Sequence, residues 1–325
     1  MTRSILCFGE ALIDLHAGDF DERGFARKLR PFAGGAPANT AVAVARLGGH
    51  ARFAGMLAQD RFGDFLLDSL QQAGVDTVDV TRTDAANTAL AFITLDAQGE
   101  RSFSFYRPPA ADLLFRTEHF REEAFEDTAA FHACSNSLTD PELAAVTLEG
   151  MRRARRAGTL VSFDLNLRPA LWPRDSDPRQ WCWPALQLAD VVKLSAEEFA
   201  WLADEGEDAA LDRLWSGSTR LLIVTDAAQP LRWFHPDAKG ELPSYSVDAV
   251  DSTGAGDAFV GGLLHQLAEQ HVGPADLDRW VGTLSGLQAA LRYASACGAL
   301  AVTRRGSFAA MSDASEVAGF MEMQP

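Results

Sequence analysis

The residues best suited to chemistry are two carboxylates, Asp251 and Asp257, which flank the small residues of the segment Asp-Ser-Thr-Gly-Ala-Gly-Asp. An apolar run, 258–264, follows at once and predicts a helix. Backbone N–H groups of small residues at a helix N-terminus bind an anion. A carboxylate beside such a site can accept the proton of a hydroxyl that attacks a phosphoryl group. The segment therefore indicates a phosphotransferase; the alternative is a glycine-rich turn that caps a buried helix.

A second motif, Gly-Gly-Ala-Pro-Ala-Asn at 34–39, leads into the helical run 41–47. Its two glycines allow a ligand to approach the backbone closely, and Asn39 offers both a donor and an acceptor. These groups suit a ligand rich in hydroxyls. The alternative is a turn in which Asn39 caps the helix.

Charged side chains also follow two predicted strands. Asp14 comes after the strand 5–8, and Arg168 comes shortly after the strand 160–164. A carboxylate at a strand end can bind sugar hydroxyls, and an arginine can bind a phosphate. The alternatives are a surface acid for Asp14 and a structural salt bridge for Arg168.

Short apolar strands alternate with helical patterns along the chain. The strands are expected at 5–8, 52–57, 130–134, 160–164, 191–194 and 221–225, and helices at 39–47, 62–73, 141–156 and 196–203. This alternation predicts an α/β fold with a doubly wound, mostly parallel sheet covered by helices on both faces. Ligands bind such sheets beyond the carboxyl ends of the strands.

One region departs from this alternation. The strand-like segments 88–95 and 100–106 are joined by the turn Asp96–Gly99, which predicts an antiparallel hairpin outside the main sheet. Two strands alone are marginal in water, so a further segment, 13–17 or 28–32, is expected to join them. A small sheet beside a ligand crevice is typical of a lid. We expect one domain over residues 1–325, with the β lid formed from about 12–32 and 87–107.

The charge balance narrows the class of partner. Lys and Arg number 29 against 45 Asp and Glu, a formal net charge of −16. Such acidity argues against nucleic acid or an anionic membrane as the main partner. The four cysteines form no C-x-x-C motif, and the N-terminal apolar run is too short for a signal peptide, so we expect a reduced, cytoplasmic protein.

Together the two glycine motifs, in this order, resemble the signatures of the ribokinase-like sugar kinases, the phosphofructokinase B family. The resemblance extends over nearly the whole chain. Within the family, bacterial fructokinases are the most similar, through the segments 9–14, 106–113, 164–169 and 192–198. It implies a ribokinase-like fold and an ATP-dependent kinase that phosphorylates a primary hydroxyl, converting fructose to fructose 6-phosphate.

The resemblance also implies a role for each matching residue. Asp257 would be the general base, the N–H groups of Gly254, Ala255 and Gly256 would form the anion hole, and Arg168 would border the phosphate path. The residues expected to bind the sugar are Asp14, Gly34, Gly35, Asn39, Arg107, Asn166 and Asp257.

ATP, Mg²⁺ and K⁺ are the cofactors that the resemblance implies. The nucleotide would contact Lys193, Ser195, Thr225, Gly254, Gly256 and Ser295. Glu198 would hold Mg²⁺ through water, and Asp251, Thr253, Ala301, Arg304 and Gly306 would form the monovalent-cation site.

The sequence departs from the family pattern at three places. Ser195 replaces the Asn of an Asn-x-x-Glu motif, the turn 226–230 lacks the usual glycines, and Ser295 stands where Asn is common. None of these departures touches Asp257. The alternative substrates are 2-keto-3-deoxygluconate or another sugar, because Arg107 and Arg168 offer cations for a sugar acid. The alternative of another class is a non-catalytic sugar- or nucleotide-binding protein, against which the intact Asp257 and anion hole argue. The small sheet would also leave an edge for a homodimer.

Overall fold

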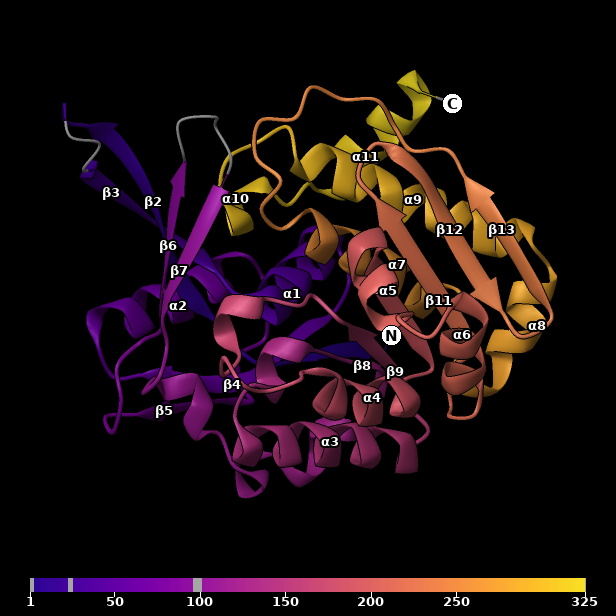
Figure 1. The fold of residues 1–325 in the computed structure, drawn as a ribbon, viewed down its shortest axis with the longest axis horizontal. Helices are drawn as coiled ribbons and strands as arrows, with labels where there is room; N and C mark the ends of the chain where they lie inside the picture. Colours follow the sequence, from indigo (N-terminus) through magenta and orange to yellow (C-terminus); the bar gives the residue numbers. More distant parts are fainter. Residues whose placement is uncertain (1–2, 23–25, 96–100, 325) are drawn as a thin grey trace.

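The protein was analysed as a computed structural model that describes residues 3–22, 26–95 and 101–324. Within these residues nine strands form one large sheet, in the order β13-β12-β11-β10-β9-β8-β1-β4-β5 (Figure 1). The strands are β1 (Ser4–Phe8), β4 (Ala51–Ala58), β5 (Val80–Thr83), β8 (Thr128–Cys134), β9 (Leu160–Asp164), β10 (Val191–Ser195), β11 (Leu221–Asp226), β12 (Gln229–His235) and β13 (Ala238–Leu242). Neighbours from β5 to β11 pair in parallel, which confirms the predicted fold class.

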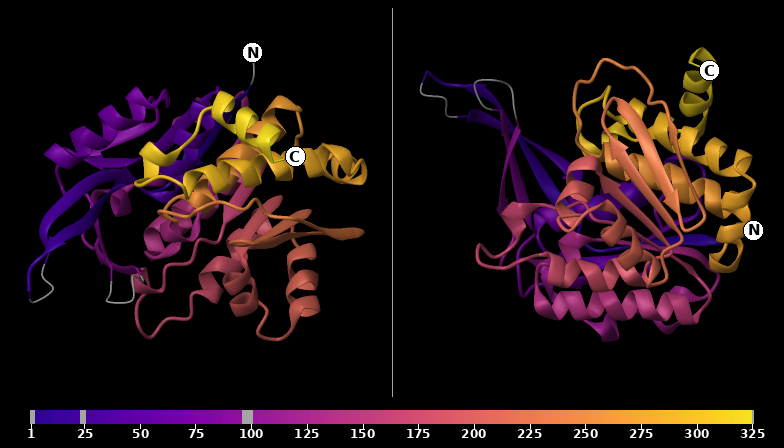
Figure 2. Two further views of the ribbon diagram at one scale, coloured as in Figure 1. Left: turned by 90° about the horizontal axis from the view of Figure 1, so that it is seen from above. Right: turned by 45° about the vertical axis from the view of Figure 1, so that its right-hand side comes forward.

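Burial on both faces explains why the central strands are short apolar runs. Every residue of β1, β4 and β9 is buried, as is typical of parallel strands between two helical layers. Side chains alternate between the two faces: Ile5 and Cys7 of β1 join one core, and Leu6 and Phe8 join the other. The helices thus divide into two layers, as the sequence alternation predicts (Figures 1 and 2).

Different helices form the two layers. One holds α1 (Ala36–Arg46), α2 (Arg61–Gln72), α7 (Ala255–Glu269), α8 (Leu277–Gly282), α9 (Ser285–Ala301) and α11 (Ala314–Met323). The other holds α3 (Pro141–Arg156), α4 (Arg179–Leu188), α5 (Ala196–Leu202) and α6 (Glu207–Trp215). Local signals fix several starts: the Asp60 and Asp140 side chains accept N–H groups at the starts of α2 and α3. None of the described helices is long and apolar enough to span a membrane.

The hairpin β12–β13 at one edge of the large sheet was not predicted. It pairs antiparallel with β11 and begins directly after the turn that follows Thr225. Gln229 and Pro230, the first two residues of β12, are exposed, so the start of this strand carries little apolar signal.

Four further described strands form the small sheet, in the order β3-β2-β6-β7: β2 (Leu12–Phe20), β3 (Ala26–Gly34), β6 (Leu90–Leu95) and β7 (Arg101–Tyr106). The predicted hairpin is confirmed for these strands, while its turn at Asp96–Gly99 lies outside the described residues. Both candidate segments join it, since β2 pairs with β3 and with β6. The sheet projects from the body, as a lid would (Figure 2).

Candidate active site

Asp257 and Asn39 meet where α1 and α7 begin. The Asn39 side-chain amide donates to Asp257 Oδ2 at 2.7 Å, and both side chains are buried. The helix α1 starts at Gly35 with no side-chain cap, and Asn39 lies in its first turn. The alternative of Asn39 as a helix cap is therefore wrong, because Gly35 is the N-cap and Asn39 lies inside the helix. Its amide donor is used on the carboxylate of a residue more than 200 positions away.

The environment of Asp257 favours a proton acceptor that works near neutral pH. Burial raises its pKa to about 7, against the Asn39 hydrogen bond, which lowers it. The negative charge of Asp164 raises the pKa further, and the cations of Arg168 and Lys193 lower it. A carboxylate with this pKa is more basic than an ordinary aspartate, and about half of it is ionised and able to take a hydroxyl proton at neutral pH.

Gly254 shapes the turn that precedes Asp257. It has a φ of 77°, in the left-handed region, where a side chain would be strained, and it is the N-cap of α7. The helix then begins at Ala255, so the N–H groups of its first turn lie at the positive end of a 15-residue helix dipole. The N–H of Ala255 also makes a long hydrogen bond of 3.3 Å to the carbonyl of Ser252.

Asp14, which is predicted to bind the sugar, is a buried residue of strand β2 in the small sheet. Its Oδ2 accepts a hydrogen bond from the Ser307 hydroxyl at 2.8 Å. Burial raises the pKa of Asp14 to about 6. A Cβ added to Gly34 would lie 2.2 Å from this Oδ2, so only glycine fits beside Asp14. The two predicted sugar-binding segments thus meet in the structure.

The ends of β9 and β10 add a buried ion pair. Lys193 Nζ lies 3.1 Å from Asp164 Oδ2, and both side chains are almost fully covered. Asp164 Oδ1 also accepts the N–H of Asn166 at 3.2 Å, in a loop where Asn166 has a φ of 39°. Arg168 forms no ion pair with any described residue, so the salt-bridge alternative is not supported. Its positive charge lowers the pKa of both Asp14 and Asp257.

Arg107 follows β7 but turns into the body. Its side chain is 1% exposed, pairs with Asp112 at 2.6 Å and donates to the carbonyl of Asn136 at 2.7 Å. The Asn136 side chain donates in turn to Glu10, whose carboxylate accepts the N–H of Ala36. The structure thus places Arg107 in a buried network beneath the lid, and its predicted contact with the sugar stays a prediction.

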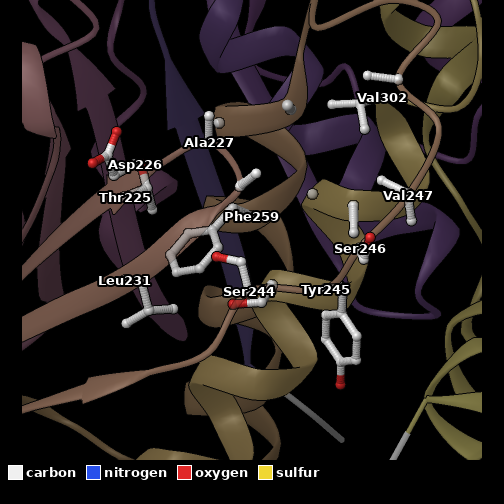
Figure 3. Close-up of a pocket in the computed structure, with 17 residues that line it drawn as sticks. Thr225, Asp226, Ala227, Leu231, Ser244, Tyr245, Ser246, Val247, Phe259 and Val302 are labelled. Atoms are coloured by element: carbon white, nitrogen blue, oxygen red, sulfur yellow. The ribbon is translucent and has the colours of Figure 1, made fainter.

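A cavity of about 340 Å³ opens beside the start of α7. In Figure 3, Phe259 lies between the turn after Thr225 and the segment around Ser244. The predicted residues Thr225, Gly256 and Ser295 line it. Most of the other lining residues are small or apolar: Ala227, Ala228, Leu231, Tyr245, Val247, Ala249, Ala255, Gly298, Ala299 and Val302. Such a surface suits the flat face of a nucleotide base.

Comparison with known proteins shows which family this chain belongs to. Residues 2–314 match the model of the pfkB family carbohydrate kinases. The chain belongs to this family. It is 40% identical to fructokinase-1 of Oryza sativa subsp. japonica, over 98% of this chain and 97% of that protein.

Solved structures of pfkB relatives agree with the fold over the full length. A fructokinase from Xylella fastidiosa with bound ATP is 54% identical, with a TM-score of 0.95, covering 100% of this chain and 99% of that one. A double-mutant fructokinase from Vibrio cholerae O395, in a form with fructose, ADP and potassium ion, is 30% identical, with a TM-score of 0.86 and 98% of each chain covered.

Two predicted nucleotide-side residues of this carbohydrate kinase form a helix cap. The Ser195 hydroxyl accepts the N–H of Glu198 at 3.1 Å, and Glu198 returns a carboxylate oxygen to the Ser195 N–H at 2.7 Å. The other oxygen of Glu198 accepts the N–H of Leu167 at 2.7 Å. Each oxygen keeps a lone pair, so the half-buried carboxylate fits a water-mediated Mg²⁺ contact.

The residues expected to hold a monovalent cation also converge. Asp251 is 3% exposed; its carboxylate accepts the N–H of Thr253 at 2.8 Å and that of Gly306 at 3.2 Å. Its N–H donates to the carbonyl of Val302 at 3.0 Å, which brings the 301–306 segment alongside. The buried Asp251 carboxylate thus accepts two backbone N–H groups, and the monovalent-cation site stays a prediction. The described residues contain no group of three or more His, Cys, Asp or Glu that could hold a metal.

The sequence analysis did not assign roles to Asp164 and Ser307. Asp164 ends a predicted strand within a segment already singled out, so its position was a signal. Ser307 stands almost 300 residues from its partner Asp14, and only the folded chain pairs them.

Proposed function

We propose that this pfkB family kinase transfers the γ-phosphoryl group of ATP to the primary hydroxyl of fructose, giving fructose 6-phosphate and ADP. The observation that carries the proposal is the buried Asp257–Asn39 pair at the N-terminus of α7, beside a cavity sized for a nucleotide. The relatives named above are fructokinases, and their similarity to this chain extends over nearly their full length. This supports fructose as the sugar.

The reaction would proceed by in-line attack. Asp14, Gly34, Gly35, Asn39 and Asn166 hold the sugar, and Asp257 accepts the proton as the hydroxyl oxygen attacks the γ-phosphorus. The bond to the bridging oxygen of ADP breaks as the new bond forms. The N–H groups of Gly254, Ala255 and Gly256 stabilise charge on the transferred group, with Arg168 beside it. Closure of the lid excludes water, the competing acceptor.

Two metal ions would support the reaction through their positive charge. Mg²⁺ would neutralise the phosphate oxygens, with Glu198 holding its water shell. In our proposal K⁺ binds at Asp251, Thr253 and the carbonyls of Ala301, Arg304 and Gly306, where it stabilises the loop before α7. Lys193, Ser195, Thr225 and Ser295 border the nucleotide.

A second candidate is a kinase for a sugar acid such as 2-keto-3-deoxygluconate. A carboxylate substrate needs a cation in the sugar pocket, and Arg168 supplies a positive charge near enough to Asp14 to lower its pKa. Arg107 is already paired with Asp112, so it offers less support for this candidate.

The deciding experiment measures ADP release from Mg-ATP with fructose, ribose, tagatose, 2-keto-3-deoxygluconate and adenosine. Fructose should give the highest kcat/KM. A higher kcat/KM for the sugar acid would replace the substrate and keep the mechanism. No release with any acceptor, in a protein that still binds ATP in a calorimeter, would favour the non-catalytic alternative.

The lid also supports a homodimer. Its face opposite Asp14 carries Leu29 and Tyr106, which are 46% and 67% exposed, and Phe92 packs against Tyr106 at 5.1 Å between ring centroids. We propose that a second copy covers this face. Sedimentation should then show a dimer that Tyr106→Glu dissociates, whereas Phe62→Glu, at an exposed phenylalanine of α2, should not.

A further inference from the structure

A buried cation touches the backbone of the anion-binding turn. A Cβ built on Gly256 would lie 2.8 Å from Lys193 Nζ and 3.8 Å from Asp164 Oδ2. The ammonium of Lys193 therefore lies directly against the first turn of α7. The chain as a whole is acidic, with a net charge of −16, but this buried cation lies beside the position where the phosphoryl group is expected to pass.

Asp164 is the group that fixes this cation. Both of its carboxylate oxygens lie within 3.3 Å of Lys193 Nζ, and one also accepts the Asn166 N–H. Residues Asp164 and Lys193 are register partners on adjacent strands, so the pair is built into the sheet. A lysine side chain is long and flexible, and two contacts from one buried carboxylate restrict it to a single position.

The pair also sets the charge around the base. Burial lowers the pKa of Lys193, but Asp164, Glu198 and Asp257 outweigh it and raise that pKa. The groups that act on Asp257 are Asn39 of α1, Asp164 of β9, Arg168 after β9 and Lys193 of β10, and the buried thiols of Cys7 and Cys134 feel its charge. Asp164 and Lys193 act on Asp257 with opposite signs.

We propose that Asp164 is a positioning residue that holds the Lys193 ammonium against Gly256, so that a fixed cation faces the γ-phosphoryl group and balances charge beside Asp257. The proposal rests on the kinase function proposed above. A lysine left free to move could pair with Asp257 itself and would then remove the base.

Two variants test the charge balance in opposite directions. Asp164→Asn removes a negative charge near Asp257, so the acidic limb of the kcat/KM profile should move to lower pH by about one unit. Lys193→Met removes a positive charge, so the limb should move to higher pH by a similar amount. Both should lower kcat at the plateau by at least ~10-fold, because the cation is displaced or absent.

Asp190→Asn is the matched control. Asp190 is also a buried carboxylate of this sheet, paired with Arg155 at 2.6 Å, but it lies at the opposite end of β10. Its loss should lower thermal stability and leave the acidic limb in place. Limbs that move together in Asp164→Asn and Lys193→Met, or that do not move, would overturn the proposal.

Binding measured without turnover separates this proposal from the choice of substrate. Calorimetry with ADP and with a non-hydrolysable ATP analogue gives the gain in affinity from the γ-phosphate. Asp164→Asn and Lys193→Met should each reduce that gain by about 10-fold, and Asp190→Asn should not. An unchanged gain would refute the role of the pair even if the enzyme phosphorylates a different sugar; a wild type that turns over no sugar would refute only the proposed function.

Discussion

The two ends of the crevice are built on different principles. At the phosphoryl end, where phosphoryl transfer is proposed, buried polar groups hold one another, as in the hydrogen bond between Asn39 and Asp257 and the ion pair between Asp164 and Lys193. At the base end, where the nucleotide base is proposed to bind, the 340 Å³ cavity is lined mainly by alanines, serines and apolar side chains. They come from the turn after β11, the 244–249 segment, α7 and α9. The first end depends on exact charge placement and the second on shape.

This difference predicts how each end responds to substitution. Loss of one polar group at the phosphoryl end leaves a buried partner without its hydrogen bond, or removes the general base Asp257 itself. Either change should lower activity strongly. At the base end, the contact is spread over many weak apolar neighbours, and one substitution changes only a part of it.

The largest effect is expected from Asp257→Asn. An amide cannot take the hydroxyl proton, so kcat should fall by at least ~10²-fold while sugar affinity changes little. The loss would not reflect unfolding: burial raises the pKa of Asp257 above its ordinary value, so ionisation at pH ~8 destabilises the fold, and the amide should melt no earlier. Near-normal turnover in a steady-state assay would refute the role of Asp257 as base.

The pH profile tests the same carboxylate without a substitution. Burial raises the pKa of Asp257 to about 7, and only the ionised form accepts a proton. Below that pKa, kcat/KM should fall about 10-fold for each pH unit, and above it the profile should level off. Measurement from pH ~5 to ~9 checks this; a profile flat down to pH ~5 would show an unperturbed carboxylate.

Gly34→Ala tests the sugar side. The new Cβ would lie 2.2 Å from Asp14 Oδ2, so the carboxylate must move away from its hydrogen bond with Ser307. We expect KM for fructose to rise by about 10-fold, equivalent to the loss of a hydrogen bond to a charged group, with little change in KM for ATP. Gly319→Ala in α11 is the control, because nothing lies within 4 Å of its added Cβ and its backbone is helical.

Ala299→Leu tests the base end. The larger side chain would occupy part of the cavity floor, and we expect KM for ATP to rise by about 5-fold while KM for fructose stays the same. Steady-state kinetics with each substrate varied in turn would measure both. An effect as large as that of Gly34→Ala would mean that shape is as demanding as charge placement in this crevice.

The same difference explains what the sequence could and could not predict. Asn39 and Asp257 lie in two contiguous motifs, so the sequence alone singled them out as candidates, and the apolar runs predicted the main strands. Asp164 lies outside both motifs, and its pairing with Lys193 depends on the register of β9 with β10. Tyr245, Val247 and Val302 carry no chemical signal of their own, and only the fold gathers them into one cavity. Pairs such as Asp14 with Ser307 depend on the register of β2 against the body, which no local pattern encodes.

The smallest expected effect lies in the turn that lacks the family's glycines. Ala227 has a φ of 44°, in the left-handed region, where a non-glycine residue costs about 1 kcal/mol. Ala227→Gly relieves this strain but makes the unfolded chain more flexible, so we expect the free energy of unfolding to rise by only ~0.5 kcal/mol. Because Ala227 lines the base cavity through shape alone, KM for ATP should change less than ~2-fold. Chemical denaturation of the variant beside wild type would measure the free energy of unfolding.

A large rise in KM for ATP, with stability unchanged, would instead show that the strained turn itself holds the nucleotide. The base end would then depend on exact placement, as the phosphoryl end does.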